Sequence, residues 1–454
     1  MADLKDQPAA ATGPYPPGLY DAWRFAAFNG LSFQIVIGSP MILYAKTLHA
    51  SATVIGIIVG MLPLLVIFQI PAAHYIERVG YKRFVLGGWG TRTLFTFAMA
   101  IVPLTSGFLD QSTRLVLILT GLFGFNLVRG IASCAWLPWI ASLVPEHFRG
   151  RYVSRDAAMA NLGSFLTVIV SALCLGETPQ PWQYTVIFTF SAAMGLVSLV
   201  FLRRVPDVAI TEKERHSNLP VPWLAMLRHP PFQKLLHLVI VWAIAYGGLT
   251  AFTVAFLKSE TALPAGRILF VTSVAFLGGL SSLWLLGHRQ DHLGSKPVLI
   301  FALGGWLVII LAWIAMAGGV LAPRLPTILL LQFLMGLFNA LVAIAFNRLA
   351  MTVIPPMGRN HFFALYSVAS NVTLGLAPVA WGLLIDYVGG WRGQGLGLNW
   401  NQYTIFYALA LAVFGLGLVL AGKLHEPKAG SLEALLTEFL VATPQRLWSR
   451  LWAD

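Results

Sequence analysis

Four of the long apolar stretches in this sequence carry polar or aromatic side chains that could bind a solute. They are Asn29 and Ser32 in the first stretch, Asn126, Arg129, Ser133 and Trp136 in the fourth, Trp242, Tyr246, Thr250 and Thr253 in the seventh, and Gln332 and Asn339 in the tenth. Their spacing places each set on one face of a helix. Such groups can hydrogen-bond a polar solute or stack on a ring, although each residue alone could equally join two helices.

Two arginines interrupt apolar stretches near their middles. They are Arg129 and Arg92, and no Asp or Glu occupies the middle of any stretch. A central arginine costs about 2.5 to 3.5 kcal/mol on membrane-insertion scales and usually has a partner. Asp156 is the nearest acid in sequence to Arg129, but the two would differ in depth by roughly 13 Å at 1.5 Å rise per residue. The two positive charges near the middles of the stretches have no acid there to balance them. This favours an anionic solute, a carboxylate or phosphate, bound by Arg129, with Arg92 as a weaker candidate.

Ion coupling usually employs a titratable group within the membrane, and the sequence offers few. The candidates are Asp156 and His237 near one end of their stretches and Asp386 near the opposite end of its own. Asp156 and Arg92 are the weak candidates for residues that couple an ion to the solute. Facilitated diffusion and anion exchange stay open as alternatives.

The composition places the chain in a membrane. Its 454 residues are 57% hydrophobic and 11% charged, against roughly 25% charged in a soluble domain. The net charge of +12 comes from residues in short intervals between apolar stretches, so we expect no nucleic-acid partner. Only Cys134 and Cys174 occur, so we expect no disulfide framework, metal or cofactor. No HExxH, GxSxG or phosphate-loop pattern indicates an enzyme.

Twelve apolar stretches are long enough to cross a bilayer core about 30 Å thick, which takes about 20 residues. They lie near 22–45, 52–75, 83–105, 113–142, 154–176, 184–203, 234–257, 265–287, 297–320, 326–350, 361–386 and 401–422. The expected fold is an all-α membrane protein with a six-helix bundle over 22–203, a linker over 204–233 and a second six-helix bundle over 234–422. Residues 1–21 precede the bundles, and residues 423–454 predict an amphipathic tail on the inner leaflet.

The distribution of lysine and arginine predicts the orientation. An even number of spans puts both ends of the chain on one side. If that side is inside, the outer intervals hold few of the 30 positive residues, namely Lys46, Arg114, Lys258, Arg267, Arg324 and Arg392. The positive-inside rule therefore predicts cytoplasmic termini, and we expect the protein in a bacterial inner (cytoplasmic) membrane.

A charged interval recurs in the two halves. The first, PAAHYIERVGYKR, contains Glu77, Arg78, Gly80, Lys82 and Arg83, and the second, GHRQDHLGSK, contains Asp291, Gly294 and Lys296. Glu77 and Asp291 are 214 residues apart, and the GLF triplets at Gly121 and Gly336 are 215 apart. Matches in one order at nearly one offset indicate an internal repeat.

These motifs resemble those of the major facilitator superfamily, whose loop signature runs glycine, three residues, acid, Arg, any residue, Gly, any residue, Lys or Arg. Ala73 stands where the first glycine is usual and Glu77 where an aspartate is usual, whereas the second copy keeps Gly287. PEHFRGRY over 145–152 and the series Gly375, Pro378, Gly382 and Asp386 are also similar. The resemblance implies two pseudo-symmetric six-helix bundles that transport a solute by alternating access.

The resemblance also implies a gate and a site. Glu77, with Arg78, Lys82 and Arg83 nearby and Gly80 allowing a positive φ, would bind the start of span 11 in the opposite half. Asp291, with Gly294 and Lys296, would do the same against span 5, so that both contacts latch the cytoplasmic side shut. Spans 1, 4, 7 and 10 would line the substrate site near the midplane, where their polar faces would meet.

The expected function is a secondary active or facilitative transporter for a small polar organic solute, with an anion favoured by Arg129. One alternative is a multidrug-type exporter of the same fold, against which the absence of central acids counts. A non-transporting membrane receptor is a further alternative. The expected partners are the solute and the lipid bilayer, and we expect a monomer.

Overall fold

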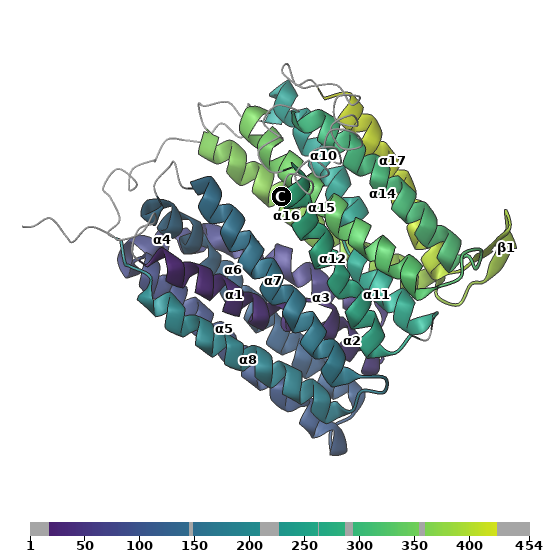
Figure 1. The fold of residues 1–454 in the computed structure, drawn as a ribbon, viewed down its shortest axis with the longest axis horizontal. Helices are drawn as coiled ribbons and strands as arrows, with labels where there is room; N and C mark the ends of the chain where they lie inside the picture. Colours follow the sequence, from purple (N-terminus) through teal and green to yellow (C-terminus); the bar gives the residue numbers. More distant parts are fainter. Residues whose placement is uncertain are drawn as a thin grey trace, which may run out of the picture.

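The computed structural model describes residues 18–144, 149–208, 227–261, 263–286, 294–353 and 359–424. Within these ranges, 12 helical segments are long and apolar enough to cross a membrane, which confirms the twelve predicted spans. Figure 1 shows the helices in two groups, one formed by the first half of the chain and one by the second. The predicted fold class is therefore confirmed.

The first group, called the N-terminal bundle, contains α1 (Leu19–Ile37), α2 (Ser39–Thr47), α3 (Ala52–Leu65), the short 3₁₀ helix η1 (Val66–Phe68), α4 (Gln69–Val79), α5 (Tyr81–Ile101), η2 (Val102–Gly107), α6 (Gln111–Leu143), α7 (Arg149–Leu175) and α8 (Pro181–Arg204). The second group, the C-terminal bundle, contains α10 (Pro230–Tyr246), α11 (Leu249–Ser259), α12 (Ala265–Leu286), α14 (Ser295–Ala317), α15 (Leu325–Val353), α16 (Arg359–Val388), the antiparallel strands β1 (Gly393–Gly395) and β2 (Leu398–Trp400), and α17 (Gln402–Gly422).

The spans run alternately in two directions, so the molecule has two ends. We call the end at which α1 begins and α17 finishes the termini end, and the end that carries the β1–β2 hairpin the hairpin end. The predicted segments 1–21, 204–233 and 423–454 fall partly or almost wholly outside the described residues. The proposed domain boundaries and the amphipathic tail therefore stay predictions.

Three of the helices begin at a polar side chain that satisfies their first amide groups. Ser51 accepts a hydrogen bond from the Val54 amide at the start of α3, and Asp110 accepts one from the Thr113 amide at the start of α6. Asn401 does the same for Tyr403 and Thr404 in α17. Because lipid offers no hydrogen bonds to backbone groups, such caps stabilise the helix starts at which they occur.

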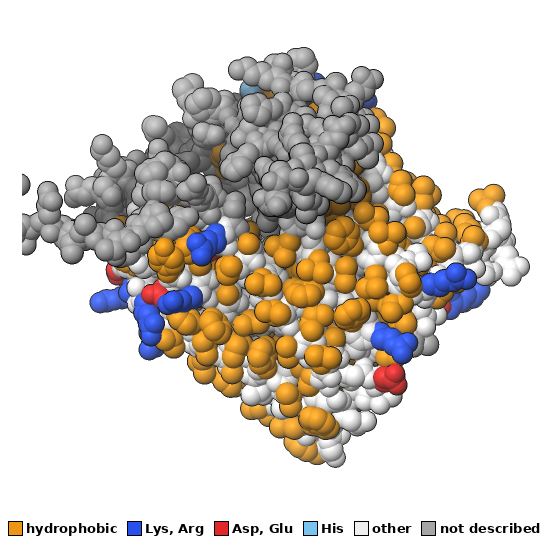
Figure 2. All heavy atoms as spheres, viewed as in Figure 1, with side chains coloured by type: hydrophobic (Ala, Val, Ile, Leu, Met, Phe, Trp, Pro, Cys, Tyr) orange, Lys and Arg blue, Asp and Glu red, His pale blue; other side chains and the backbone are white. Residues whose placement is uncertain are grey.

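The flank of the molecule is apolar. Figure 2 shows hydrophobic side chains over the sides of both bundles, with the visible lysines and arginines towards their ends. Leu94, Leu173 and Val308 are exposed by 68%, 80% and 67%. Exposure of such large apolar side chains is expected of a surface that meets lipid rather than water.

The two bundles touch through pairs of helices related by the internal repeat. α3 packs against α16, and α7 packs against α12. A Cβ at Gly56 would clash with the carbonyl group of Pro378, and one at Gly60 would clash with the carbonyl oxygen of Gly375. The helices therefore approach at backbone distance, which only glycine allows at these positions.

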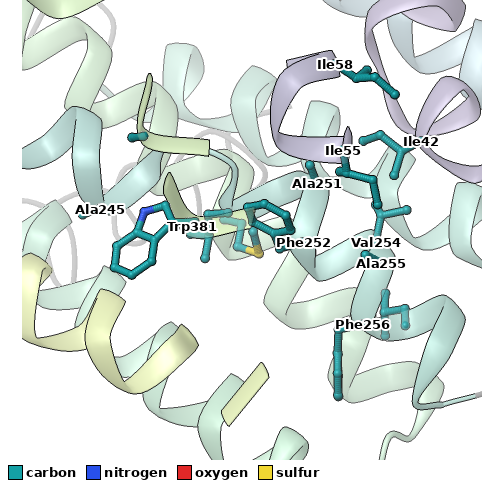
Figure 3. Packing of buried hydrophobic residues seen from close by; sticks show 14 of the residues in the cluster. Ile42, Ile55, Ile58, Ala245, Ala251, Phe252, Val254, Ala255, Phe256 and Trp381 are labelled. Atoms are coloured by element: carbon teal, nitrogen blue, oxygen red, sulfur yellow. The ribbon is translucent and has the colours of Figure 1, made fainter. Parts of the chain in front are cut away.

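At the hairpin end the bundles are closed by apolar side chains. Figure 3 shows Ile42 and Ile55 of the N-terminal bundle beside Ala251 and Val254 of α11. α11 contacts both α2 and α3. The hairpin end of the molecule is therefore closed by contacts between the bundles.

The backbone contact between α3 and α16 predicts a specific sensitivity. We expect Gly56→Ala to lower the free energy of unfolding by about 1–3 kcal/mol, because the added methyl group meets backbone that cannot move aside. The matched control is Gly87→Ala in α5, where a Cβ would meet no atom within 4 Å. It should leave stability unchanged or raise it by up to about 1 kcal/mol through helix propensity. Thermal unfolding of the purified variants in detergent measures both, and equal effects would contradict the close packing.

Candidate functional site

A cavity of about 470 Å³ lies between the two bundles. Helices from both halves line it, and its polar lining consists of amide and hydroxyl side chains. These are Gln34, Ser39, Asn161, Tyr246, Thr250, Thr272, Gln332 and Asn339. None of the described residues that line the cavity is Lys, Arg, His, Asp or Glu. The wall therefore offers many hydrogen bonds and no formal charge.

Two membrane spans break into half-helices at this cavity. The first span breaks at Gly38, between α1 and α2, and the seventh breaks at Gly247 and Gly248, between α10 and α11. Gly248 has φ of 79°, a conformation that an L residue rarely adopts. Gly38 and Gly247 are 209 residues apart, close to the offset of the internal repeat.

Each break directs a helix start towards the cavity. Ser39 opens α2 and lines the wall, and Thr250 is the second residue of α11 and is exposed there. The first amide groups of a helix have no partner within it and carry partial positive charge. Paired breaks of this kind in the two halves of a transporter commonly mark the binding site.

Tyr246 is held against the cavity by an aromatic group in the C-terminal bundle. The ring of Trp242 stacks on that of Tyr246 with an interplanar angle of 8° and centroids 5.1 Å apart. Trp306 and Phe414 pack edge-on against Trp242. Trp242 is therefore the support of Tyr246 rather than part of the described cavity wall.

The structure separates the predicted binding residues into two sets. Tyr246, Thr250, Gln332 and Asn339 come together at the cavity. The others are not among the described residues of its wall, namely Asn29, Ser32, Asn126, Arg129, Ser133, Trp136, Trp242 and Thr253. Residues of the seventh and tenth spans thus line one cavity, whereas the four residues of the fourth span are not among the described residues of its wall.

Three residues of the polar face of α6 have their observed partners within the N-terminal bundle. A Cβ at Gly124 would clash with the ring of Phe95 in α5, so α6 and α5 lie close together. Asn126 donates to the Leu122 carbonyl at 2.9 Å and Ser133 donates to the Gly130 carbonyl at 2.7 Å, both within their own helix. Trp136 packs against Phe25 with ring centroids 5.0 Å apart. Trp136 therefore packs on α1, and the Asn126 amide and the Ser133 hydroxyl are bonded within α6.

Ser32 also lies inside the bundle. Its side chain is 3% exposed, and its hydroxyl lies beside Gly195 of α8. Its carbonyl oxygen accepts a hydrogen bond from the Ser191 hydroxyl. Ser32 thus joins α1 to α8, because the side of α1 that carries it is turned away from the cavity.

Asn29 is the partner of Arg92. Its Oδ1 accepts a hydrogen bond from Nη2 of Arg92 at 2.6 Å and another from Nε1 of Trp89 at 3.2 Å. Arg92 is 2% exposed, with its guanidinium carbon 5.2 Å from the ring centroids of Trp89 and Phe125. An amide and two aromatic faces therefore accommodate this intramembrane charge.

Arg129 lies close enough to Arg92 for their charges to interact. Within the described part of the chain, neither guanidinium forms an ion pair. Asp156 instead accepts a hydrogen bond from the Tyr152 hydroxyl at 3.4 Å. Burial, together with this carboxylate, raises the pKa of Tyr152 well above its usual range, so the hydroxyl stays a donor. The sequence places Arg129 and Asp156 at different depths in the membrane, and the structure contains no ion pair between them.

Four polar residues of the cavity wall were not predicted, namely Gln34, Ser39, Asn161 and Thr272. Asn161 and Thr272 belong to spans 5 and 8, which were not considered as lining helices. The signal for Gln34 and Ser39 is the GSP sequence at 38–40, whose glycine and proline predict a helix break. The YGG sequence at 246–248 is the corresponding signal in the second half.

The two charged intervals share one backbone geometry. Gly80 and Gly294 have φ of 84° and 83°, and each immediately precedes a helix, α5 and α14 respectively. Lys296 donates from Nζ to the Leu424 carbonyl at 2.7 Å, while Arg78 and Arg83 are exposed. Asp291 and the side chain of Glu77 lie outside the described part of the structure. The gating role of these intervals stays a prediction.

A sequence comparison decides the family. The model of the Major Facilitator Superfamily matches residues 25–305 and, in a second match, residues 249–454. The chain belongs to the major facilitator superfamily. As a member of this family, the protein is a membrane transporter rather than an enzyme. No curated protein matches the sequence.

Solved structures of the superfamily have the same fold. A D-xylose-proton symporter has a TM-score of 0.72 at 15% identity, covering 91% of this chain and 99% of its own. The inward open xylose transporter XylE from E. coli has a TM-score of 0.67 at 15% identity, with coverages of 92% and 99%. A mutant of the nucleoside transporter NupG has a TM-score of 0.69 at 10% identity, with coverages of 90% and 100%. At these identities the likeness concerns the fold.

The contact between Asn29 and Arg92 predicts a non-additive effect on stability. We expect Asn29→Leu to lower the free energy of unfolding by about 2 to 4 kcal/mol, because it leaves a buried charge without its hydrogen-bond acceptor. Adding Arg92→Met should restore most of the loss, since both polar groups are then gone. Thermal unfolding of the two single variants and the double variant measures the coupling. Losses that simply add within about 0.5 kcal/mol would contradict the contact.

Proposed function

We propose that this transporter moves a small, uncharged polar organic solute across the membrane by alternating access. The observation that carries the proposal is the lining of the central cavity by amides and hydroxyls without a charged residue among those described. Amide side chains both donate and accept, so they can pair with hydroxyl or carbonyl groups in either direction. A charged solute would lose hydration there without gaining a counter-charge.

The size and shape of the cavity support this class of solute. A volume of about 470 Å³ lies within the usual range of roughly 300 to 1,000 Å³ for small-molecule sites. The ring of Tyr246, backed by Trp242, provides a flat surface on which a sugar or other ring could stack. The names of two structural relatives, a D-xylose-proton symporter and a nucleoside transporter, are compatible with a neutral polar solute.

The arrangement of the bundles supports an inward-facing state. If the termini are cytoplasmic, as the positive-inside rule predicts, the closed hairpin end faces outward. Alternating access then requires α2 and α11 to separate from each other at the hairpin end while the termini end closes. A bacterial inner membrane and a monomeric state remain part of this proposal.

An organic anion is the second candidate solute. Arg129 and Arg92 favour it, because neither is paired with an acid among the described residues. In that case Arg129 binds the solute, and Asp156 stays a candidate for coupling. The multidrug-type alternative is less well supported, since such a cavity usually contains an acid and none lines this one in the described part of the chain.

A thermal-stability screen distinguishes these candidates. Purified protein is heated with neutral sugars and nucleosides, organic anions, or lipophilic cations. We expect stabilisation by neutral polar solutes, with an affinity about tenfold lower in Gln332→Leu because one hydrogen bond of roughly 1.4 kcal/mol is lost. Arg129→Ala should keep this stabilisation. Gln111→Leu is the matched control, since Gln111 is exposed at the start of α6.

The other outcomes separate the alternatives. Stabilisation by anions that vanishes in Arg129→Ala would replace the neutral solute by the anionic one. Stabilisation by lipophilic cations in all variants would instead favour an exporter. Uptake of the stabilising solute into proteoliposomes then measures transport itself.

A further inference from the structure

Asp386, in the last turn of α16, caps a helix of the opposite bundle. Its Oδ1 accepts a hydrogen bond from the Ala52 amide at 2.8 Å, and its Oδ2 accepts one from the Thr53 amide at 2.7 Å. The Thr53 hydroxyl also donates to Oδ2 at 2.6 Å. Ala52 and Thr53 are the first two residues of α3. A carboxylate of the C-terminal bundle therefore satisfies three donors at a helix start of the N-terminal bundle.

The electrostatics of the two helices favour this contact. A carboxylate near the C-terminus of its own helix is destabilised by the partial negative charge there, whereas one at a helix N-terminus is stabilised. Asp386 exchanges the first environment for the second by reaching across the interface. Hydrogen bonds to an ionised carboxylate are about twice as strong as neutral ones. The contact therefore contributes more than a neutral hydrogen bond at the same place.

Other groups at the hairpin end surround this carboxylate. The positive charge of Lys46, near the end of α2, acts on Asp386. Tyr403 of α17 also lies within electrostatic range, and its hydroxyl is hydrogen-bonded to that of Ser259 at the end of α11 at 3.0 Å. The cap thus lies where the α2–α3 connection meets the ends of α11, α16 and α17.

The repeat-related position in the other half is built differently. There the start of α12 meets the end of α7, and the Gly266 amide donates to the Gly176 carbonyl at 2.8 Å. The nearby ion pair between Arg267 and Glu177 is long, 3.8 Å, with side chains exposed by 62% and 76%. An exposed pair of this kind contributes little. Of these two repeat-related contacts, only the one between α3 and α16 has a charged cap.

We propose that Asp386 is a latch that holds the two bundles together at the hairpin end. Opening that end separates the start of α3 from the end of α16, so the three hydrogen bonds must break before the outward-facing state forms. The latch acts at the opposite end of the molecule from the predicted Glu77 contact. It sets the balance of the two states whatever solute the cavity accepts.

The test is a distance measurement in the full-length protein in lipid nanodiscs without solute. Spin labels are placed at Ser106→Cys and Ala322→Cys, which are exposed positions at the hairpin ends of the two bundles, in a Cys134→Ser, Cys174→Ser background. We expect Asp386→Asn to raise the ratio of long to short distances between the two spin labels by about tenfold or more, because at least one charged hydrogen bond is lost. Thr53→Val should shift it in the same direction by less, and it provides the readout if the first variant does not fold.

The matched control is Asp110→Asn. Asp110 also caps a helix start and accepts from a threonine, Thr113, but both groups belong to the N-terminal bundle. Its replacement should leave the distances unchanged. An unchanged distribution in Asp386→Asn, or an equal widening in Asp110→Asn, would overturn the latch. Because no solute is present, either result is independent of which solute the transporter carries.

Discussion

The structure depends on one constraint, that backbone polar groups in lipid must be satisfied within the protein. Continuous helices meet it along most of every span. The first and seventh spans depart from it at Gly38 and at Gly247 and Gly248. Gly38 lines the cavity between the bundles, and Gly247 and Gly248 lie between Tyr246 and Thr250, which also line it. The amide groups freed at these breaks can meet water or a polar solute there. The location of the cavity and the location of irregular backbone are therefore two results of the same requirement.

The same environment decides how the bundles hold together. In lipid the burial of apolar surface drives helix association only weakly, so close packing and hydrogen bonds must do more. Gly56 and Gly60 bring α3 to backbone distance from α16, and Asp386 adds a charged cap where these helices end. Such an interface is strong only while the helices are in register, because dispersion forces and hydrogen bonds both decay over short distances. A small rotation between the bundles therefore breaks most of these packing contacts and hydrogen bonds at the same time.

The sequence was sufficient for the features that depend on local composition. Span number followed from the length of apolar stretches, and the repeat followed from the matched intervals around Gly80 and Gly294. The binding face was predicted only in part. Spacing indicates that Asn126, Ser133 and Trp136 share one side of α6, but the neighbours that this side meets, such as Phe25 of α1 beside Trp136, depend on how the helices pack. Likewise the partner of Arg92 is an amide 63 residues away on another helix, which no local pattern specifies.

The glycine contacts between α3 and α16 have a consequence for how this protein can diversify. The cavity wall is made of side chains such as Gln34 and Gln332, whereas the contact of α3 with α16 at Gly56 and Gly60 is made with backbone. Exchanging one amide for another residue alters what the wall recognises without altering the meeting of the helices. Replacing an interface glycine by a larger residue instead changes how α3 packs against α16, without exchanging a polar side chain of the cavity wall. At the contact between α3 and α16, the residues that set how the helices meet are thus different from the polar residues of the cavity wall.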